Sequence, residues 1–172
     1  MTNKTGTLME SSFIEKGLVR FLITERPKER NLTDYVGELL KYNVTDVVRV
    51  CEPSYTTDKL LEANIPVHDW YFDDGSAPPP EILSNWLELI EKRFGEASDN
   101  CIAVHCVAGL GRAPVMVAIA LIESGIKYHD AVEFIRERRK GAFNMKQLQF
   151  LEAYKPISRK KKKKNGEACL VM

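Results

Sequence analysis

Short runs rich in apolar and β-branched residues alternate along the chain with longer stretches whose apolar positions have helical spacing. The short runs predict strands at residues 17–24, 45–51, 65–70 and 101–104. The longer stretches predict helices at residues 31–42, 57–64, 80–94, 114–124, 128–140 and 145–154. Strands and helices alternate first and helices alone follow, so the pattern favours an α/β fold with a mainly parallel central sheet and helices on both faces.

Particular residues mark the ends and faces of these elements. Arg20 is expected to face water from the first strand, and Asn31 to cap the helix that follows it. The stretch 114–124 is almost wholly apolar, so its helix must be buried. One face of the helix at 31–42 is expected to be buried through Leu32, Val36, Leu39 and Leu40.

The length of 172 residues suits one domain with a sizeable core. We expect this domain to occupy residues 1–157 and a disordered tail to occupy residues 158–172. No apolar run reaches the roughly 18 residues of a transmembrane helix, and the polar start lacks the pattern of a secretory signal. Four cysteines without such a signal indicate a reducing compartment and reactive rather than structural thiols.

The formal net charge of +1 hides an uneven distribution. Six of the 25 basic residues lie in residues 159–172 beside a single acid, Glu167, which leaves residues 1–158 with a net charge of −4. The last four residues, Cys169-Leu170-Val171-Met172, fit the C-a-a-X prenylation signal, and the final methionine favours farnesyl. One lipid chain anchors only weakly, and the basic run supplies the second signal for an anionic membrane.

Two alternatives to this membrane address exist. The basic run is also compatible with a nuclear-import or nucleic-acid patch. It contains no interleaved aromatic residues and adjoins a lipid site, so we favour the membrane and expect no nucleic-acid partner. The expected location is the cytoplasmic face of the plasma membrane and endosomes, or the cytoplasm or nucleus without the prenyl group.

The stretch from His105 to Arg112, H-C-V-A-G-L-G-R, contains the strongest chemical signal. It lies between an apolar strand and a helix start, so several backbone N–H groups turn inward and form an anion site. That field favours the thiolate of Cys106 as nucleophile, and the Arg112 guanidinium suits two phosphate oxygens. The residues expected to bind phosphate are Val107, Ala108, Gly109, Leu110, Gly111 and Arg112.

This pattern indicates phosphoryl transfer to cysteine. The alternatives are an ordinary buried cysteine beside a surface arginine, and a rhodanese-like sulfur transferase. The two loop glycines and His105 favour a phosphatase. No cofactor is expected, and His68 and His129 show no ligand partners that would indicate a metal site.

The loop at residues 69–75, D-W-Y-F-D-D-G, is the expected source of a general acid. It follows the third predicted strand at the same sheet edge as the cysteine loop. A departing oxygen must be protonated, and we assign this role to Asp74 with Asp73 as the alternative. Gly75 and the prolines after it suit a closing lid.

These stretches and the tail together resemble the phosphatases of regenerating liver, which are prenylated, dual-specificity-like protein tyrosine phosphatases. The resemblance covers the chain from about Phe13 onward and implies a cysteine-based protein tyrosine phosphatase fold. By that similarity Cys106 is the nucleophile, Arg112 the phosphate binder and Asp74 the acid. One departure is that Tyr71 replaces the family's usual proline, so the acid loop is expected to be less rigid.

Ala113 stands where most cysteine phosphatases have serine or threonine. A hydroxyl there stabilises the thiolate when water breaks the phosphocysteine, so we expect slow turnover and a persistent phosphocysteine. The uncharged side chains of Val107, Ala108 and Leu110 favour phosphotyrosine over highly charged inositol lipids.

Cys51 ends the second predicted strand at the sheet edge of Cys106. A reactive thiolate beside a second cysteine is the arrangement of a redox switch, and a buried strand cysteine is the alternative. The resemblance favours the switch, in which Cys51 and Cys106 form a disulfide. Cys101 is interpreted as core and His105 as structural.

Two functions follow from these observations. The first is a membrane-associated, redox-regulated protein tyrosine phosphatase of low activity that acts on phosphorylated proteins. The second is a pseudophosphatase-like module whose pocket binds an acidic side chain of a partner. The resemblance implies a homotrimer and binding to the CBS-domain region of cyclin M magnesium transporters.

Overall fold

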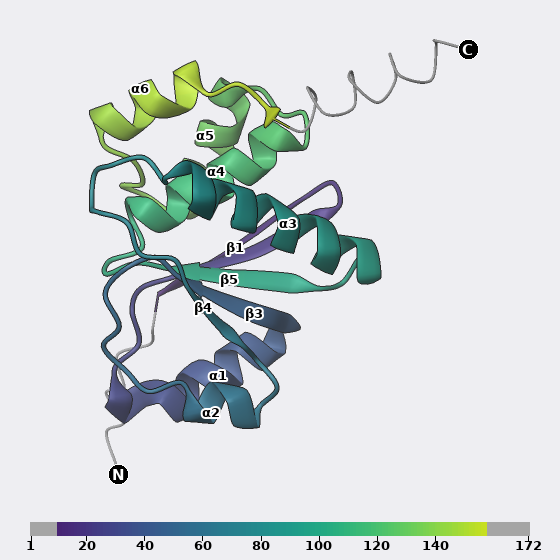
Figure 1. Ribbon diagram of the computed structural model, residues 1–172, viewed down its shortest axis with the longest axis vertical. Coiled ribbons are helices and arrows are strands. Elements are labelled where there is room, and N and C mark those ends of the chain that lie inside the picture. The colour runs from purple at the N-terminus through teal and green to yellow at the C-terminus, as the bar shows by residue number, and fades with distance from the viewer. Residues whose placement is uncertain (1–9, 158–172) are drawn as a thin grey trace.

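A five-stranded sheet forms the centre of the computed structural model, which describes residues 10–157 (Figure 1). The strands are β1 (Ser11–Lys16), β2 (Val19–Thr24), β3 (Val44–Arg49), β4 (Val67–Asp69) and β5 (Cys101–His105). Their order in space is β1-β2-β5-β3-β4. Only β1 and β2 pair antiparallel, and the other neighbours pair parallel. The predicted mainly parallel sheet is confirmed.

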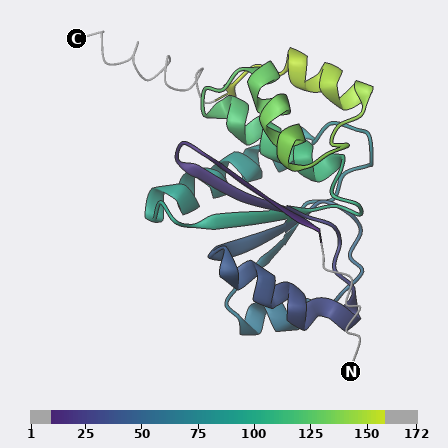
Figure 2. The same cartoon turned by 180° about the vertical axis from the view of Figure 1, so that it is seen from behind.

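Helices cover both faces of this sheet, as predicted. One face carries α1 (Leu32–Lys41), which a short 3-10 turn (Glu29–Asn31) precedes, and α2 (Asp58–Glu62). The other face carries α3 to α6, and the reverse view shows the same two helical layers (Figure 2). Their bounds are α3 (Pro80–Glu96), α4 (Arg112–Glu123), α5 (Tyr128–Arg138) and α6 (Met145–Ala153).

The amino-terminal strands differ from the prediction. The strand expected at residues 17–24 begins at Val19, because Gly17 has a φ of +59° and turns the chain between two strands. The strand before it, β1, was missed, and it pairs with β2 at the sheet edge. Arg20 does not simply face water, since its guanidinium binds Glu15 at 2.8 Å and covers the Phe13 ring.

Two expectations for the first helix were wrong. Leu40 is 57 % exposed, whereas Leu32 and Leu39 are buried and Val36 is half-buried. Asn31 occupies the N-cap position of α1, but its side chain accepts a hydrogen bond from the Lys28 N–H at 2.7 Å. The side chain therefore closes the preceding 3-10 turn instead of capping α1.

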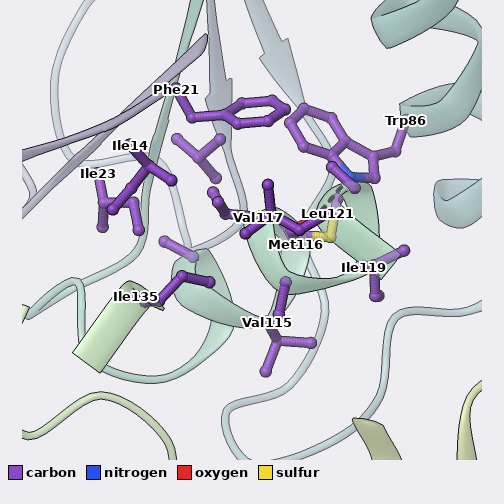
Figure 3. Close-up of a cluster of buried hydrophobic side chains, with 14 of the residues drawn as sticks. Ile14, Phe21, Ile23, Trp86, Val115, Met116, Val117, Ile119, Leu121 and Ile135 are labelled. Carbon is purple, nitrogen blue, oxygen red and sulfur yellow. Dashed lines mark hydrogen bonds between the residues drawn. The ribbon is translucent and has the colours of Figure 1, made fainter. Parts of the chain in front are cut away.

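Helix α4 is the centre of the larger core. Every residue from Arg112 to Ile122 is buried, and Figure 3 shows the side chains around it from β1, β2, α3 and α5. Trp86 of α3 donates its indole N–H to the Met116 carbonyl at 2.9 Å. Burying each large apolar side chain contributes roughly 1.5–3 kcal/mol. This packing fixes the amino-terminal end of α4, to which the cysteine loop is attached.

The loops that follow β4 and β5 lie at the carboxyl edge of the parallel strands, on the left side of Figure 1. They bring the two predicted chemical segments to one edge of the sheet. Among residues 10–157, no helix is long and apolar enough to cross a membrane. The predicted tail, with Cys169 and the basic run, lies outside the described residues.

Candidate active site

The cysteine loop joins the end of β5 to the first residue of α4, as the sequence predicts. Cys106 is a free thiol, 4 % exposed, at the start of the loop. Gly111 has a φ of −123° and a ψ of −87° and is the N-cap of α4. The loop thus lies at the amino-terminal end of a buried helix, where backbone N–H groups favour an anion.

Four consecutive carbonyl groups of the loop, at residues 107–110, are bound by residues outside it. The outer two accept from backbone N–H groups: Val107 O from Arg26 at 3.0 Å and Leu110 O from Phe143 at 2.8 Å. The middle two, Ala108 O and Gly109 O, accept from the Arg139 guanidinium at 3.1 and 2.6 Å. No described peptide bond is cis. In a planar trans peptide the N–H points opposite to the carbonyl. The N–H groups of residues 108–111 therefore point away from these partners and toward the inside of the loop.

Arg112 is a buried charged group of this site, with 6 % exposure. Its Nη1 donates to the carbonyl of Phe72 at 3.0 Å and to that of Val50 at 3.4 Å. Its Nε is buried without a hydrogen-bond partner in the described chain, and lies 3.8 Å from Asp74 Oδ1. The guanidinium is thus held by two backbone carbonyls through Nη1, while the buried Nε–H is left for a ligand.

The acid loop brings the two candidate aspartates into different surroundings. Asp73 accepts a hydrogen bond from the Tyr71 hydroxyl at 2.8 Å, and its carbonyl accepts from the N–H and the hydroxyl of Ser76. Asp74 instead faces Arg112, and its side chain is 80 % exposed. Of the two, Asp74 is therefore the carboxyl group available to a ligand in this site.

Gln147 is a site residue that the sequence reasoning missed. It is 3 % exposed, and its Nε2 has no hydrogen-bond partner among the described residues. Its Oε1 accepts from the Asn144 N–H at 3.0 Å in a capping box that begins α6. A Cβ added at Gly111 would lie 2.9 Å from Gln147 Nε2, so this amide donor is aimed at the loop. The Asn-x-x-Gln spacing of a capping box was the available signal.

His105 is structural, as expected, and its role can be specified. Burial lowers its pKa to about 4, so the ring is neutral at neutral pH. Its Nδ1 donates to the Cys106 carbonyl at 3.1 Å, and its Nε2 accepts from the Tyr55 hydroxyl at 2.6 Å. This pair of bonds fixes one tautomer and holds the backbone at Cys106.

Cys51 lies next to the same histidine, with its Sγ 3.8 Å from His105 Nδ1. Burial raises the pKa of the Cys51 thiol, and the charge of Cys106 raises it further. Both cysteines belong to the same buried cluster and are free thiols. The sequence expectation that Cys51 lies near the nucleophile agrees with this placement. Cys101 is fully buried in β5, as expected of a core residue.

Within the described residues, no group of three or more histidine, cysteine and acidic side chains is arranged to hold a metal ion. His68 instead pairs with the buried Asp46 at 2.8 Å. What the site offers is a sulfur nucleophile, inward N–H groups, a buried guanidinium and an accessible carboxyl group. This arrangement suits phosphoryl transfer through cysteine.

Comparison with known proteins gives a consistent assignment. The family model described as "Polymorphic toxin system, DSP-PTPase phosphatase" matches residues 24–126. The chain is 53 % identical over 155 residues to the PRL-1 phosphatase of Drosophila melanogaster, covering 90 % of this chain and 88 % of the relative. It is 54 % identical over 141 residues to human protein tyrosine phosphatase type IVA 3, covering 82 % of each chain. The chain belongs to the type IVA protein tyrosine phosphatases, the phosphatases of regenerating liver.

Solved structures support a protein tyrosine phosphatase fold. A protein tyrosine phosphatase from Leishmania major superposes with a TM-score of 0.78 at 38 % identity, covering 86 % of this chain and 99 % of the other. Kinase associated phosphatase superposes with a TM-score of 0.67 at 19 % identity, covering 85 % of this chain and 93 % of the other, and supports the fold alone. The chain is thus a cysteine-based protein tyrosine phosphatase in fold and in class of activity.

Proposed function

We propose that this type IVA phosphatase removes phosphate from phosphotyrosine in proteins through Cys106, Arg112 and Asp74. The observation that carries the proposal is the pair of buried donors, Arg112 Nε and Gln147 Nε2, that have no hydrogen-bond partner in the described chain. Leaving buried donors unpaired costs roughly 1–3 kcal/mol each, and a phosphoryl group that enters the loop would satisfy them.

The reaction proceeds in two steps. The Cys106 thiolate attacks phosphorus, and the bond from phosphorus to the tyrosyl oxygen breaks as Asp74 gives its proton to that oxygen. Water then attacks the phosphocysteine, Asp74 accepts a proton from the water, and the bond from sulfur to phosphorus breaks. The products are inorganic phosphate and the free thiolate.

The second step is expected to be slow, because Ala113 is fully buried beside Arg112 and has no hydroxyl group. The departing sulfur then lacks one hydrogen-bond donor. Because the first step does not require this donor and the second does, the phosphocysteine is expected to persist.

Rapid mixing with an aryl phosphate tests the proposal. We expect one burst of phenol per protein molecule and a phosphate adduct on Cys106 by intact mass, followed by slow turnover. Cys106→Ser should show neither. Asp74→Asn should slow the burst far more than the matched Asp73→Asn, because only Asp74 faces Arg112. Wild-type protein with no burst and no adduct would contradict the proposed chemistry.

The substrate preference rests on the loop side chains. Val107 is 47 % and Leu110 39 % exposed, and neither carries charge. A phosphotyrosine ring flanked by apolar side chains fits such a rim, whereas an inositol polyphosphate requires more basic groups. Parallel assays with a phosphotyrosine peptide and a phosphoinositide, at equal ionic strength, should favour the peptide.

A second candidate function is a binding module for the CBS-domain region of cyclin M magnesium transporters. Exposed apolar side chains lie in the anion loop, at Val107 and Leu110, in the acid loop, at Tyr71, and at the start of α6, at Met145. They suit a partner with an acidic side chain flanked by apolar residues, and a phosphorylated Cys106 would block it. The family resemblance is the source of this partner and of the homotrimer. Co-purification with a cyclin M CBS fragment before and after phosphorylation of Cys106 tests the binding, and sedimentation velocity tests the trimer.

Redox regulation is proposed through a disulfide between Cys51 and Cys106. Their shared contact with His105 and their common burial support it. Mild peroxide should produce a Cys51–Cys106 peptide by mass spectrometry and abolish the burst. Reduction should restore the activity, and Cys101→Ser should leave this response unchanged.

We also propose prenylation at Cys169 and residence on the cytoplasmic face of the plasma membrane and endosomes. The C-a-a-X sequence and the adjacent basic run support this proposal. Cys169→Ser should move the protein into the cytoplasm or nucleus. Unchanged membrane residence of this variant would contradict the proposal.

A further inference from the structure

A buried arginine outside the predicted catalytic set contacts the phosphate-binding loop. Arg139 follows the last residue of α5 and is 4 % exposed. Its guanidinium binds the carbonyl oxygens of Ala108, Gly109, Ile23 and Glu10 and the hydroxyl of Ser12. Among the described residues, no carboxylate forms an ion pair with it. A buried cation that binds mainly carbonyl groups is costly, so its position calls for a functional explanation.

The bonds from Arg139 to two carbonyl groups of the loop account for its buried position. Arg139 Nε donates to Gly109 O at 2.6 Å, and Nη2 donates to Ala108 O at 3.1 Å. Each carbonyl shares a planar peptide unit with the next N–H, which points the opposite way. We propose that Arg139 is a positioning residue that holds the N–H groups of Gly109 and Leu110 toward a bound phosphoryl group. This inference rests on the proposed function.

The other two loop carbonyls are held by backbone N–H groups and not by a side chain. Val107 O and Leu110 O are bound by the backbone N–H groups of Arg26 and Phe143. The middle of the loop, at residues 108 and 109, is the part without such backbone partners in the described chain. There a rotated peptide would turn a carbonyl oxygen toward the anion and remove a donor. The guanidinium opposes that rotation at two successive peptides.

Gly109 is adapted to this contact in two ways. Its φ of +73° lies in the region that favours glycine. A Cβ at this position would also lie 2.5 Å from Arg139 Nη2 and 2.6 Å from Thr24 O. The absent side chain therefore provides the space into which the guanidinium fits. Gly109 and Arg139 act as one unit.

The opposite side of the guanidinium connects the loop to the sheet. Arg139 Nη1 donates to Ser12 Oγ at 3.1 Å and to the carbonyl of Ile23 at 3.5 Å. Both residues belong to the antiparallel pair of β1 and β2. The loop is thereby fixed to a rigid part of the fold that is remote from it in sequence.

Arg139→Gln tests this inference, and Arg138→Gln is the matched control. Arg138 has the same charge, and its guanidinium binds a backbone carbonyl, Phe134 O at 3.0 Å, away from the loop. The two readouts are the affinity for tungstate, an inert tetrahedral oxyanion, by calorimetry and the burst rate with an aryl phosphate. Arg139→Gln should weaken both by about 10- to 100-fold, less than the roughly 100- to 1000-fold loss on removal of an oxyanion donor, because the N–H groups are displaced but still present. The control should match wild type.

Arg139→Lys separates geometry from charge. An ammonium group keeps the charge but cannot hold two carbonyls in a planar fork. Most of the loss should therefore remain, and full activity of this variant would overturn the inference. Ser12→Ala is the milder variant in case Arg139→Gln does not fold. It removes one acceptor of the guanidinium and should lower tungstate affinity by roughly 2- to 5-fold.

Urea unfolding shows whether each variant is folded at the assay temperature. A folded Arg139→Gln with the tungstate affinity and burst rate of Arg138→Gln would contradict the positioning role, and so would wild-type values for a folded Ser12→Ala. Failure of the proposed function itself has a different signature, since wild-type protein would then neither bind tungstate nor give a burst.

Discussion

Ala113 is the residue whose small size has the largest expected effect on turnover. It is fully buried in the first turn of α4, next to Arg112. Ala113→Ser should shorten the lifetime of the phosphocysteine, because the new hydroxyl donates a hydrogen bond to the departing thiolate. A hydrogen bond to a charged group is worth about 1.5–3 kcal/mol, which is roughly 10- to 150-fold in rate. Intact mass after rapid quenching measures the lifetime.

Ala118→Ser is the control for this prediction, because it adds a hydroxyl at another fully buried position of α4. It should leave the adduct lifetime unchanged, whatever it does to stability. An equally long-lived adduct in Ala113→Ser and wild type would show that the missing hydroxyl is not the cause of slow turnover.

Gln147 separates two roles within one side chain. Its Oε1 completes the capping box of α6, while its Nε2 is the unpartnered donor near Gly111. Gln147→Glu keeps the cap acceptor but replaces the donor with a carboxylate. We expect the burst rate to fall by at least about tenfold, and the urea midpoint to fall as well, because the new carboxylate is buried.

Asn144→Ala is the complementary control for Gln147. It removes the other half of the capping box and should lower the free energy of unfolding by about 1 kcal/mol. The Gln147 amide keeps its own bond to the Asn144 backbone N–H, so the burst rate should stay near wild type. A burst at the wild-type rate in Gln147→Glu would show that the Gln147 amide does not bind the phosphoryl group.

At the scale of the elements, hydrogen bonds hold the acid loop around Tyr71, the position at which the family resemblance implies a proline. Tyr71 donates to Asp73, and Arg112 binds the Phe72 carbonyl. The expectation of a less rigid loop therefore needs a direct test. Tyr71→Phe should slow the burst for a poor leaving group by roughly 2- to 12-fold, the value of one neutral hydrogen bond.

A good leaving group provides the internal control, since it departs without a proton and should react at the wild-type rate with Tyr71→Phe. Tyr71→Pro should rescue the slow substrate if backbone rigidity alone is required, because proline fixes φ. Equal slowing for both leaving groups would mean that Tyr71 acts on binding rather than on proton transfer.

The elements differ in how far the sequence could predict them. The strand, loop and helix around Cys106 were predictable, because an apolar strand, two glycines and an apolar helix follow one another. Strand β1 was missed because its edge position leaves most of its residues polar, S-S-F-I-E-K. Arg139 and Gln147 were missed because burial of a polar side chain depends on tertiary contacts that no periodicity shows.

At the scale of the whole molecule, one residue, His105, both positions the cysteine loop and affects the stability of the fold. His105 is fully buried in the central strand β5, between the Tyr55 hydroxyl and the Cys106 carbonyl. Burial lowers its pKa to about 4, below the ordinary value of 6.5. The unfolded chain therefore binds more protons than the native protein between these two pH values. The contribution of neutral His105 to the free energy of unfolding is therefore complete above pH 6.5 and is lost as the pH is lowered toward 4.

Urea unfolding at pH 7 and pH 4.5 measures this loss. The histidine alone should account for about 2 kcal/mol of the decrease, since one pKa unit corresponds to about 1.4 kcal/mol. The Asp46 carboxyl does not contribute in this range. Although burial raises its pKa, hydrogen bonds from His68 and Arg93 outweigh burial and hold the pKa at about 2. Its stabilisation is lost only as the pH falls below about 4.

Two substitutions identify the source of the acid sensitivity. His105→Gln removes the buried ring and should flatten the pH dependence, at a lower stability at pH 7 because Tyr55 loses its partner. His129→Gln changes an exposed histidine of α5 and should keep the wild-type slope. If His105→Gln and wild type lose the same free energy between pH 7 and pH 4.5, groups other than this histidine control the acid response, and the link between the site and the stability of the fold is absent.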